Sequence, residues 1–399
     1  MKKIVVENLV KIFGDRPGKA LELLKKGKTK DEILARTGRP VGVADVSFHV
    51  EEGEILVIMG LSGSGKSTLV RCVNRLIEPT AGSVVIDGVD VTALPKDKLL
   101  EFRRTKFGMV FQNFALFPHK TVADNAAFGL EIQGKDPGKR REKALRALEQ
   151  VGLAGWEDKY PGELSGGMQQ RVGLARALAL DPDILLMDEA FSALDPLIRR
   201  DMQDELVTLQ ETMRKTIVFI THDLDEAIKL GDRIVLMKDG AVVQEGTAED
   251  ILTNPATRYV ERFVEDVDLS KALTAASVMK KPGVTVHLPT DGPRTALRKM
   301  DERGISSIFA LNKDHKLVGV ITADDAAAAL ERGEKKLEGA VRTDFIAIGP
   351  DTPVQELMAD MALTFCPAAV VNEDGRLKGV IVRGSLLAGL AEKGRAQNG

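Results

Sequence analysis

The segment Gly60-Leu-Ser-Gly-Ser-Gly-Lys-Ser67 constrains the fold of this chain more than any other stretch. It fits the pattern G-x-x-x-x-G-K-[ST] without a mismatch, directly after the apolar run 53–60 and before a helical pattern that includes Leu69 and Val73. A strand, a glycine-rich turn and a helix N-terminus form a cradle of backbone N–H groups for phosphate. The sequence therefore predicts an α/β nucleotide-binding domain. The alternative, a fortuitous glycine- and serine-rich turn, does not explain this context.

Each part of this loop has an expected chemical role. Its amides are expected to hold phosphate oxygens, while Lys66 reaches the β- and γ-phosphates and Ser67 ligates Mg²⁺. The predicted nucleotide-binding residues of the loop are Gly60, Ser62, Gly63, Ser64, Gly65, Lys66, Ser67 and Thr68.

Further short apolar runs alternate with helical patterns up to about residue 265. Residues 183–190, 216–223 and 232–240 are predicted strands. Continuous apolar runs are typical of parallel strands that are covered on both faces. Polar residues at the carboxyl ends of such strands lie where these sheets bind ligands. The chain is thus expected to have a mixed or parallel sheet as its core.

Two acidic residues end the predicted strand at 183–190. A pair of carboxylates after an apolar run is usually only a strand ending, but here a phosphate loop precedes it. Asp188 is predicted to hold Mg²⁺, directly or through water, and Glu189 to act as the general base on the attacking water.

Two more polar residues follow predicted strands. Gln112 comes after "FGMVF" and is a candidate for contact with the attacking water or the metal, the alternative being an ordinary exposed glutamine. His222 ends the strand "TIVFIT". A lone histidine is more often structural, but at this position we expect a contact with the γ-phosphate.

A second glycine-rich turn, "LSGGMQQR" at 164–171, also precedes a helical pattern. Such a turn suits an anion, yet the chain already has a better phosphate loop. Nothing in the sequence of a single domain explains why it would have two turns that suit an anion.

An insertion at 14–40 and a repeat near the C-terminus complete the organisation. The insertion is charged, with apolar residues at helical spacing, and is expected to form two short helices. A solvated surface insertion and a docking element are both consistent with it. Residues 314–325 and 374–385 superpose with an offset of 60 residues, and 291–300 superposes on 351–361. Each repeat is expected to form helix, strand, turn, strand and helix, and to pack against the other because neither can bury a core alone.

The composition limits the kinds of partner that the chain is expected to have. The 399 residues carry a net charge of −3, which gives no reason to expect a nucleic acid partner. No apolar run approaches the length of about 20 residues that a membrane helix needs. If the protein acts at a membrane, other chains are therefore expected to span it. Cys72 and Cys366 suggest buried thiols in a reducing compartment.

The order of the phosphate loop, Gln112, "LSGGMQQR", "LLMDEA", "SALD" and His222 resembles that of ABC transporter ATPase subunits. Met168 replaces a common glutamine. The resemblance covers 1–265 and implies a P-loop NTPase domain with a helical subdomain at about 113–180. It also implies a head-to-tail homodimer, in which the 164–171 signature closes over ATP on the partner. The further nucleotide-binding residues that it implies are Ser165, Gly166, Gly167, Gln169, Asp195 and Phe13, the last as an adenine-stacking ring in place of the commoner tyrosine.

The insertion, "ILTNPATRYVERFVEDVD" and the C-terminal repeats narrow the resemblance to the ATPases of glycine betaine/proline betaine importers with tandem CBS domains. The expected domains are 1–265, a linker at 266–275, CBS repeats at 276–335 and 336–392, and a flexible tail at 393–399. The resemblance implies ATP and Mg²⁺ as cofactors. It also implies multi-span permease subunits, a substrate-binding domain or protein, and a peripheral place at the cytoplasmic face of the plasma membrane.

The sequence leaves alternatives to osmoprotectant import. The imported solute could instead be choline, carnitine or proline. ABC ATPases without a transporter usually fuse two ATPase halves or carry long coiled coils, and this chain has neither. A nucleotide sensor with a degenerate ATPase is disfavoured because every catalytic position is occupied.

The CBS repeats resemble regulatory modules that bind adenine nucleotides. The pattern G-h-x-[ST]-x-x-[DN] matches at Gly319, with Thr322 and Asp325 as candidate ligands, whereas the second repeat has Val382 and Ser385 at the equivalent positions. The resemblance extends to cyclic di-AMP at a CBS dimer interface, and the alternative is a purely structural dimerisation module. The basic segment 134–150 is expected to be a solvated helix face or a salt-dependent contact with anionic lipid.

Overall fold

A computed structural model describes residues 1–265, 273–364 and 366–386. The chain divides into two compact units, Met1–Val264 and Glu265–Gly399, and each is described by itself. The predicted tail at 393–399 lies outside the described residues, as do most of the predicted linker and the end of the second repeat.

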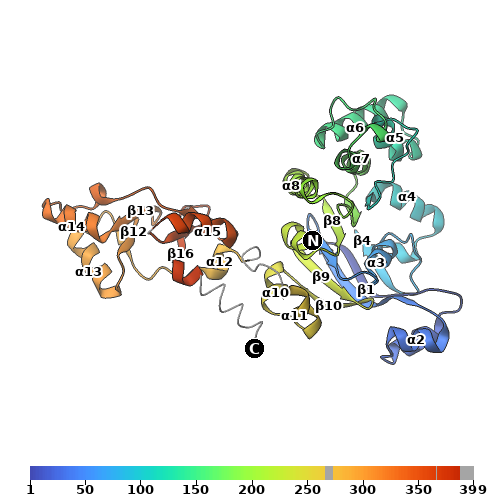
Figure 1. Ribbon diagram of the computed structural model, residues 1–399, viewed down its shortest axis with the longest axis horizontal. Helices are drawn as coiled ribbons and strands as arrows, with labels where there is room; N and C mark the ends of the chain where they lie inside the picture. The colour runs from blue at the N-terminus through green and yellow to red at the C-terminus, as the bar shows by residue number, and fades with distance from the viewer. Residues whose placement is uncertain (266–272, 365, 387–399) are drawn as a thin grey trace. The chain divides into compact units, whose positions relative to one another are not determined.

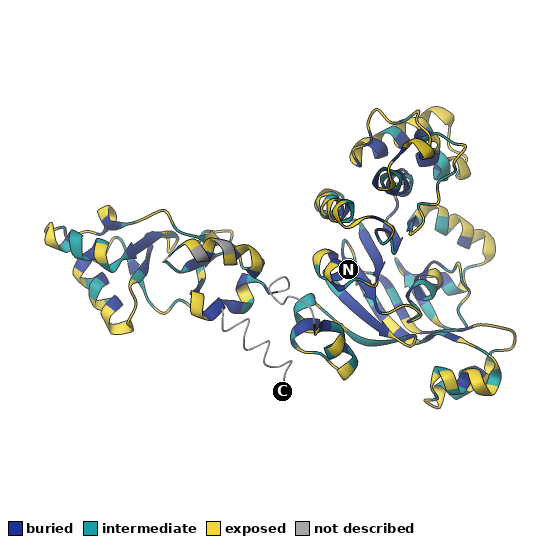
Figure 2. Cartoon of the chain, in the orientation of Figure 1, coloured by how far each residue is buried: buried dark blue, intermediate teal, exposed yellow. Residues whose placement is uncertain are grey.

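A six-stranded sheet forms the centre of the first unit (Figure 1). Its strands, in spatial order, are β10 (Ala241–Gly246), β9 (Arg233–Lys238), β3 (Ile55–Met59), β8 (Thr216–Thr221), β7 (Ile184–Asp188) and β6 (Phe107–Phe111). All neighbours are parallel except the β9–β10 hairpin. Every residue of β3, β7 and β8 is buried (Figure 2), which explains the continuous apolar runs and confirms the predicted α/β class.

An antiparallel sheet packs beside this one. Its order is β2 (Val41–Glu51), β1 (Lys2–Ile12), β4 (Ala81–Ile86) and β5 (Val89–Asp90). Both sheets and helix α3 (Lys66–Val73) share one hydrophobic core, to which Val46, Ile58 and Val70 each contribute. The helix that follows the phosphate loop therefore packs against both sheets.

Helices α5 (Val122–Ile132), α6 (Pro137–Gln150) and α7 (Gly166–Leu178) pack against one another within the segment 113–180 (Figure 1). The remaining helices of the unit are α4 (Lys96–Lys106), α8 (Pro196–Met213), α9 (Leu224–Leu230), α10 (Ala248–Thr253) and α11 (Arg258–Val264), with 3₁₀ turns η1 (Val91–Ala93) and η2 (Pro161–Glu163).

The insertion forms the two short helices that the sequence predicts, α1 (Gly18–Lys25) and α2 (Lys30–Thr37). Thr29 and Glu32 make a reciprocal capping box at the start of α2, and Gly38 ends it in the left-handed conformation. Ala20 and Ile33 are buried against the ends of β1 and β2. The insertion is thus a docked element with its own small core.

The second unit contains two similar sheets, as the internal repeat predicts. They are β11 (Thr285–His287), β12 (Ser307–Leu311) and β13 (Leu317–Thr322), and β14 (Ala347–Ile348), β15 (Ala368–Val371) and β16 (Leu377–Ile381). The helices of this unit are α12 (Ala275–Val278), α13 (Pro293–Arg303), α14 (Ala323–Glu331), η4 (Glu338–Ala340) and α15 (Val354–Leu363). Phe309, Val320 and Ala369 from the two sheets share a core, so the repeats pack as a pair.

The short first strand of each repeat was not expected. β11 and β14 pair in parallel with the strand that follows the first helix. Strands of two or three residues show no periodicity in sequence, because their pairing is decided by tertiary contacts.

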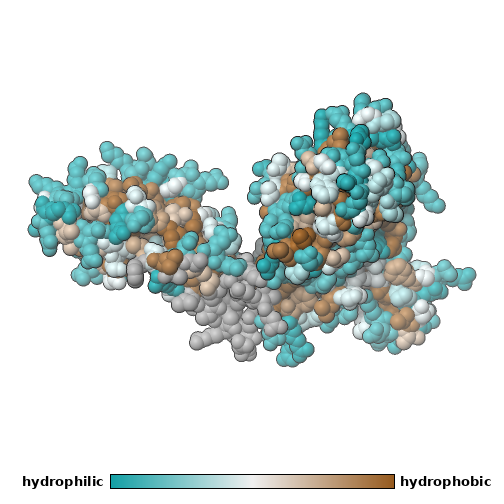
Figure 3. Space-filling view, turned by 45° about the horizontal axis from the view of Figure 1, so that its top comes forward, coloured by the Kyte–Doolittle hydropathy of each residue, from teal (hydrophilic) through white to brown (hydrophobic). Residues whose placement is uncertain are grey.

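Within the described residues, no helix is long and apolar enough to cross a bilayer. The face in view in Figure 3 mixes hydrophilic residues with smaller hydrophobic patches. Both cysteines are free, but only Cys72 is buried, where burial raises the pKa of its thiol to about 12; Cys366 is partly exposed, contrary to expectation.

Candidate functional site

The phosphate loop leaves β3 at Gly60 and enters α3 at Lys66, as the motif requires. Gly60, Gly63 and Gly65 have φ angles of 147°, 78° and 101°. A Cβ on Gly65 would lie 2.3 Å from the carbonyl oxygen of Gly42, and one on Gly60 would lie 2.2 Å from that of Met237. Glycine is required at both positions by conformation and by space.

Lys66 folds back over the loop. Its Nζ donates to the carbonyl oxygens of Gly60 at 2.7 Å and Leu61 at 3.2 Å, and it lies 3.9 Å from Oε1 of Glu189. The side chain is 5% exposed, and burial lowers the pKa of its ammonium. The positive charge of Lys66 therefore lies at the phosphate loop, where a phosphate can replace the two carbonyl oxygens as its hydrogen-bond partner.

Two of the three predicted metal ligands, Ser67 and Asp188, are in contact. Oγ of Ser67 donates to Oδ1 of Asp188 at 2.8 Å, and Oδ2 of Asp188 accepts from Nη2 of Arg71 at 3.3 Å. Hydroxyl and carboxylate oxygens together with nucleotide phosphates are the ligands that Mg²⁺ prefers, so these residues fit that ion. Arg71 was not predicted. Its position four residues after Ser67 places both on one face of α3 and was the signal that could have found it.

Glu189 follows β7 in a left-handed conformation with φ of 48°. Its N–H donates to the carbonyl of Ile220 on β8 at 3.1 Å, and its Oε2 lies 3.4 Å from Nδ1 of His222. The strained backbone turns the carboxylate towards Lys66 and His222. Side chains that follow β7 and β8 therefore converge with Lys66 of α3 at one edge of the sheet.

Gln112 lies at the same edge of the sheet. It is exposed and directly follows Phe111, which pairs with Asp188 across β6 and β7. The strand pairing thus places Gln112 next to the acidic pair, and its contact with the attacking water or the metal stays a prediction.

Phe13 lies beside the phosphate loop despite the insertion that follows it. A Cβ on Gly42 would lie 2.7 Å from Cε2 of Phe13 and 3.1 Å from Cγ2 of Thr68. The ring is 36% exposed, and Nζ of Lys11 lies 5.2 Å from its centroid. An accessible aromatic face next to Thr68 suits stacking on a nucleotide base.

The 164–171 signature forms the start of α7. Oγ of Ser165 caps the helix by accepting from the N–H of Met168 at 3.3 Å, and Gly166 is exposed. Nε2 of Gln169 donates to the carbonyls of Pro161 and Leu164 at 3.0 and 3.2 Å, which holds the turn in place.

Gly167 permits a close approach of α7 to α8, because a Cβ there would lie 2.5 Å from Cγ2 of Ile198. Asp195 caps α8 through Oδ1, which accepts from the N–H groups of Leu197 and Ile198. Among the described residues, no hydrogen bond or ion pair joins the signature to the phosphate loop. The two glycine-rich turns are separate structures within one chain.

The basic residues of 134–150 lie largely on an exposed face of α6. Two of the arginines in this segment are paired, Arg141 with Asp158 and Arg146 with Glu142. This segment is a mixed-charge solvated face more than a uniform cationic surface.

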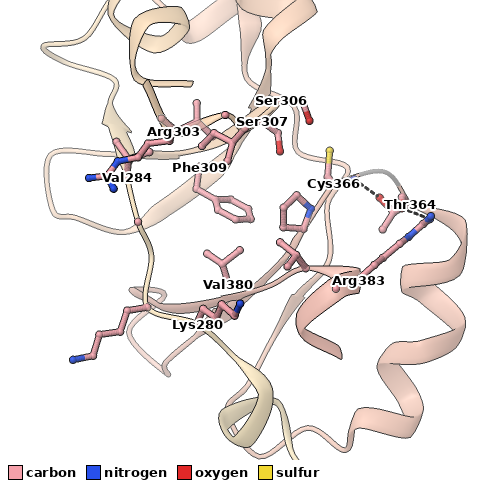
Figure 4. A pocket seen from close by; sticks show the side chains of 18 of the residues that line it. Lys280, Val284, Arg303, Ser306, Ser307, Phe309, Thr364, Cys366, Val380 and Arg383 are labelled. Atoms are coloured by element: carbon pink, nitrogen blue, oxygen red, sulfur yellow. Dashed lines mark hydrogen bonds between the residues drawn. The ribbon is translucent and has the colours of Figure 1, made fainter. Parts of the chain in front are cut away.

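In the second unit, Thr322 and Asp325 contact each other. Oγ1 of Thr322 donates to Oδ2 of Asp325 at 2.6 Å and accepts from its N–H at 3.1 Å, which caps α14. The cavity of about 640 Å³ in this unit lies between the two repeats, and its lining includes neither Thr322 nor Asp325. Ser307, which does line it, pairs with Thr322 across β12 and β13. Phe309 and Val380 point into the cavity, and Lys280, Arg303 and Arg383 lie at its edges (Figure 4).

This cavity was not predicted. Nε and Nη2 of Arg383 donate to the carbonyls of Met361 and Thr364, which fixes a cation at the cavity edge. Arg383 directly follows Val382, the residue that replaces the threonine of the pattern in the second repeat. The sequence feature that could have indicated this cavity was the basic residues of both repeats, and not the hydroxyl pattern.

Comparison with known proteins finds a matching family for each of the two units. Residues 43–192 match the family described as ABC transporter, and residues 275–332 and 337–392 each match the CBS domain. The chain is 56% identical to the glycine betaine/carnitine transport ATP-binding protein of Listeria monocytogenes over 98% of both chains. It is 58% identical to the glycine betaine transport ATP-binding protein of Bacillus subtilis, over 98% of this chain and 92% of that one.

A solved structure is similar to the first unit. It is the dimeric post-hydrolysis state of an ATP-binding cassette bound to ADP and Pi, with 34% identity and a TM-score of 0.51. The similarity covers 61% of this chain and 98% of that chain. The cassette fold of this chain is therefore shared with a protein that assembles as a dimer.

Proposed function

Since the chain belongs to the ATP-binding subunits of the glycine betaine/proline betaine ABC transporters that carry tandem CBS domains, we propose that it powers import of glycine betaine or a related quaternary amine. The observation that carries the proposal is the convergence of Lys66, the Ser67–Asp188 pair and the Glu189–His222 pair at one sheet edge. This arrangement supplies what phosphoryl transfer to water requires.

The residues divide the work of hydrolysis among them. Lys66 and the loop amides bind the β- and γ-phosphates, and Glu189 accepts a proton from the attacking water. His222 orients the γ-phosphate and the Glu189 carboxylate, and Gln112 contacts the water or the metal. Ser67 and Asp188 would hold Mg²⁺, which when bound neutralises charge on the β- and γ-phosphate oxygens.

The complete site requires two chains. Ser165 and the amides of Gly166 and Gly167 lie at a helix N-terminus, where they favour an anion. In a head-to-tail homodimer this N-terminus faces the γ-phosphate held by the partner's loop. The separation of the two turns within one chain supports this assembly.

Multi-span permease subunits and a substrate-binding domain or protein complete the transporter, with this chain peripheral at the cytoplasmic face of the plasma membrane. The loop after Gln112 and the helices to about residue 160 are the proposed surface for the membrane subunits. The substrate itself binds to other chains.

The test is uptake of labelled solutes into vesicles that contain the reconstituted complex with ATP inside. We expect ATP-dependent uptake of labelled glycine betaine. Unlabelled choline, carnitine and proline are each expected to reduce this uptake, to differing extents. Glu189→Gln is the matched inactive control. ATP hydrolysis without uptake of any of these solutes would favour a transporter of another solute or a non-transport ATPase.

We further propose that the second unit regulates the ATPase by binding an adenine nucleotide, with cyclic di-AMP as the leading candidate. An apolar floor with cations at the edge suits a base and a phosphate, and about 640 Å³ falls in the usual range for small-molecule sites. Cyclic di-AMP at a CBS dimer interface is a second location for the same ligand.

A charge reversal at the cavity edge tests this regulation. Arg303→Glu is expected to weaken binding of cyclic di-AMP by about tenfold, since a contact with a charged phosphate is lost. Arg298→Glu, on the same helix but outside the lining of the cavity, should leave binding unchanged. Titration of the full chain measures both variants. A loss with Thr322→Val and none with Arg303→Glu would place the ligand at the first-repeat motif instead.

A further inference from the structure

The insertion at 14–40 brings a lysine next to the phosphate loop. Lys30 is the first residue of α2, and its Cε and Nζ lie 2.8 and 3.0 Å from the point where a Cβ on Gly240 would stand. Gly240 is in the β9–β10 turn, and its N–H donates to the carbonyl of Ser64 in the loop at 2.9 Å. The ammonium is therefore one backbone segment away from the nucleotide-binding turn.

The same backbone contacts the start of α3. A Cβ on Gly65 would lie 3.4 Å from Cα of Gly240 and 2.3 Å from the carbonyl oxygen of Gly42. The Phe13 ring packs on the Cα of Gly42, as described above. Lys30 thus lies near the strand segment that separates the base-stacking ring from the phosphate loop, where the ribose and the α-phosphate of a bound nucleotide would be.

The Lys30 ammonium lacks a close partner. Within the part of the chain that the structure describes, its Nζ has no hydrogen bond and no salt bridge, whereas Lys28 in the same insertion pairs with Glu32 at 3.1 Å. Burial lowers the pKa of Lys30, and Asp239 and Asp31 act on it only at longer range. A partly buried cation without a hydrogen-bonded anion is unfavourable, and binding an anion would relieve this cost.

The position of Lys30 is fixed by its surroundings. The capping box holds the start of α2, and Ile33 in the next turn is fully buried against β1 and β2. The N–H of Phe13 donates to the carbonyl of Pro40 at 3.0 Å, which closes the base of the insertion. The backbone of Lys30 is therefore part of an element that packs on the sheet.

We propose that Lys30 is a further nucleotide-binding residue, whose ammonium donates to the α-phosphate of bound ATP. The inference rests on the proposed ATP site. It assigns the α-phosphate because Phe13 marks the base end of that site and Lys66 the β- and γ-phosphate end. A lysine suits this contact, since its compact charge with three donors can meet a phosphate from the side. The insertion then contributes to nucleotide binding and is not only a surface feature.

The test is equilibrium binding of ATP and ADP to the full chain. Lys30→Gln is expected to weaken binding of both nucleotides by the same factor of about ten, because both carry the α-phosphate. Lys30→Arg keeps the charge and should restore most of the affinity. An unchanged dissociation constant for Lys30→Gln would overturn the proposal, and so would a loss confined to ATP, which would indicate the γ-phosphate.

Two controls separate charge from structure. Lys26→Gln removes an exposed lysine of the same insertion and should leave both affinities unchanged. Thr29→Ala removes the α2 cap but keeps the ammonium, so an equal loss with this variant would show a structural role and overturn the assignment. If the unmodified chain binds no ATP and Lys66→Ala changes nothing, the ATP site itself fails instead.

Discussion

Glu189→Gln is expected to reduce ATP hydrolysis by about 10²- to 10⁴-fold, the usual contribution of a positioned general base. The substitution keeps the size of the side chain but removes the carboxylate that lies 3.4 Å from Nδ1 of His222 and 3.9 Å from Nζ of Lys66. ATP binding should survive, because the loop and Lys66 are unchanged. The ATP-bound dimer should therefore accumulate, and size-exclusion chromatography with ATP measures it beside the hydrolysis rate.

Glu226→Gln is the matched control for this variant. Glu226 is a buried carboxylate on the neighbouring helix α9, where burial raises its pKa and Gln203 donates to it at 3.2 Å. It does not contact Lys66 or His222, so its loss should leave most of the activity. Comparable inactivation by both variants would show that any buried carboxylate near β8 has this effect, and the assignment of the base would be wrong.

Lys66→Ala and Ser165→Arg are each expected to abolish hydrolysis, for different reasons. Lys66→Ala removes the buried ammonium that serves the β- and γ-phosphates of its own chain, so ATP binding is lost as well. Ser165→Arg places a long side chain at the exposed start of α7, where the partner's γ-phosphate must approach. That variant should still bind ATP as a monomer. Hydrolysis and equilibrium ATP binding on each purified variant distinguish the two defects.

Loss of a helix cap has to be separated from loss of the shared site. Ser165 caps α7, and removing such a cap costs about 1 kcal/mol. Thr121→Ala removes the corresponding cap of α5, where Oγ1 of Thr121 accepts from the N–H of Asp124 at 3.1 Å. This control should keep its activity. If Thr121→Ala were as inactive as Ser165→Arg, the effect would come from the stability of the helices.

The parts of the site predicted from sequence are those with a local signal. The phosphate loop follows a buried strand and precedes a helix, and Asp188 and His222 end apolar runs. Parallel strands align such endings at one edge of a sheet, so their meeting follows from the pattern. The two short helices of the insertion likewise follow from the spacing of their apolar residues.

The parts that the sequence could not predict depend on contacts between distant segments. Lys30 lies near the loop only because the β9–β10 turn and β2 pack against Gly65, and no periodicity encodes that approach. The cavity of the second unit arises from side chains of both repeats, among them Phe309 and Arg383, so a motif read within one repeat misses it. Arg71 is an intermediate case, because its spacing from Ser67 is local but its partner Asp188 is not.

One ATP site is proposed to be built from two copies of this chain, and mixing the two inactive variants tests this assembly most directly. In a head-to-tail dimer of one Lys66→Ala chain and one Ser165→Arg chain, one site keeps both an intact loop and an intact signature. Random pairing at equal amounts should therefore recover about a quarter of the wild-type hydrolysis. A mixture that hydrolyses no more ATP than the two variants measured apart would contradict the shared site.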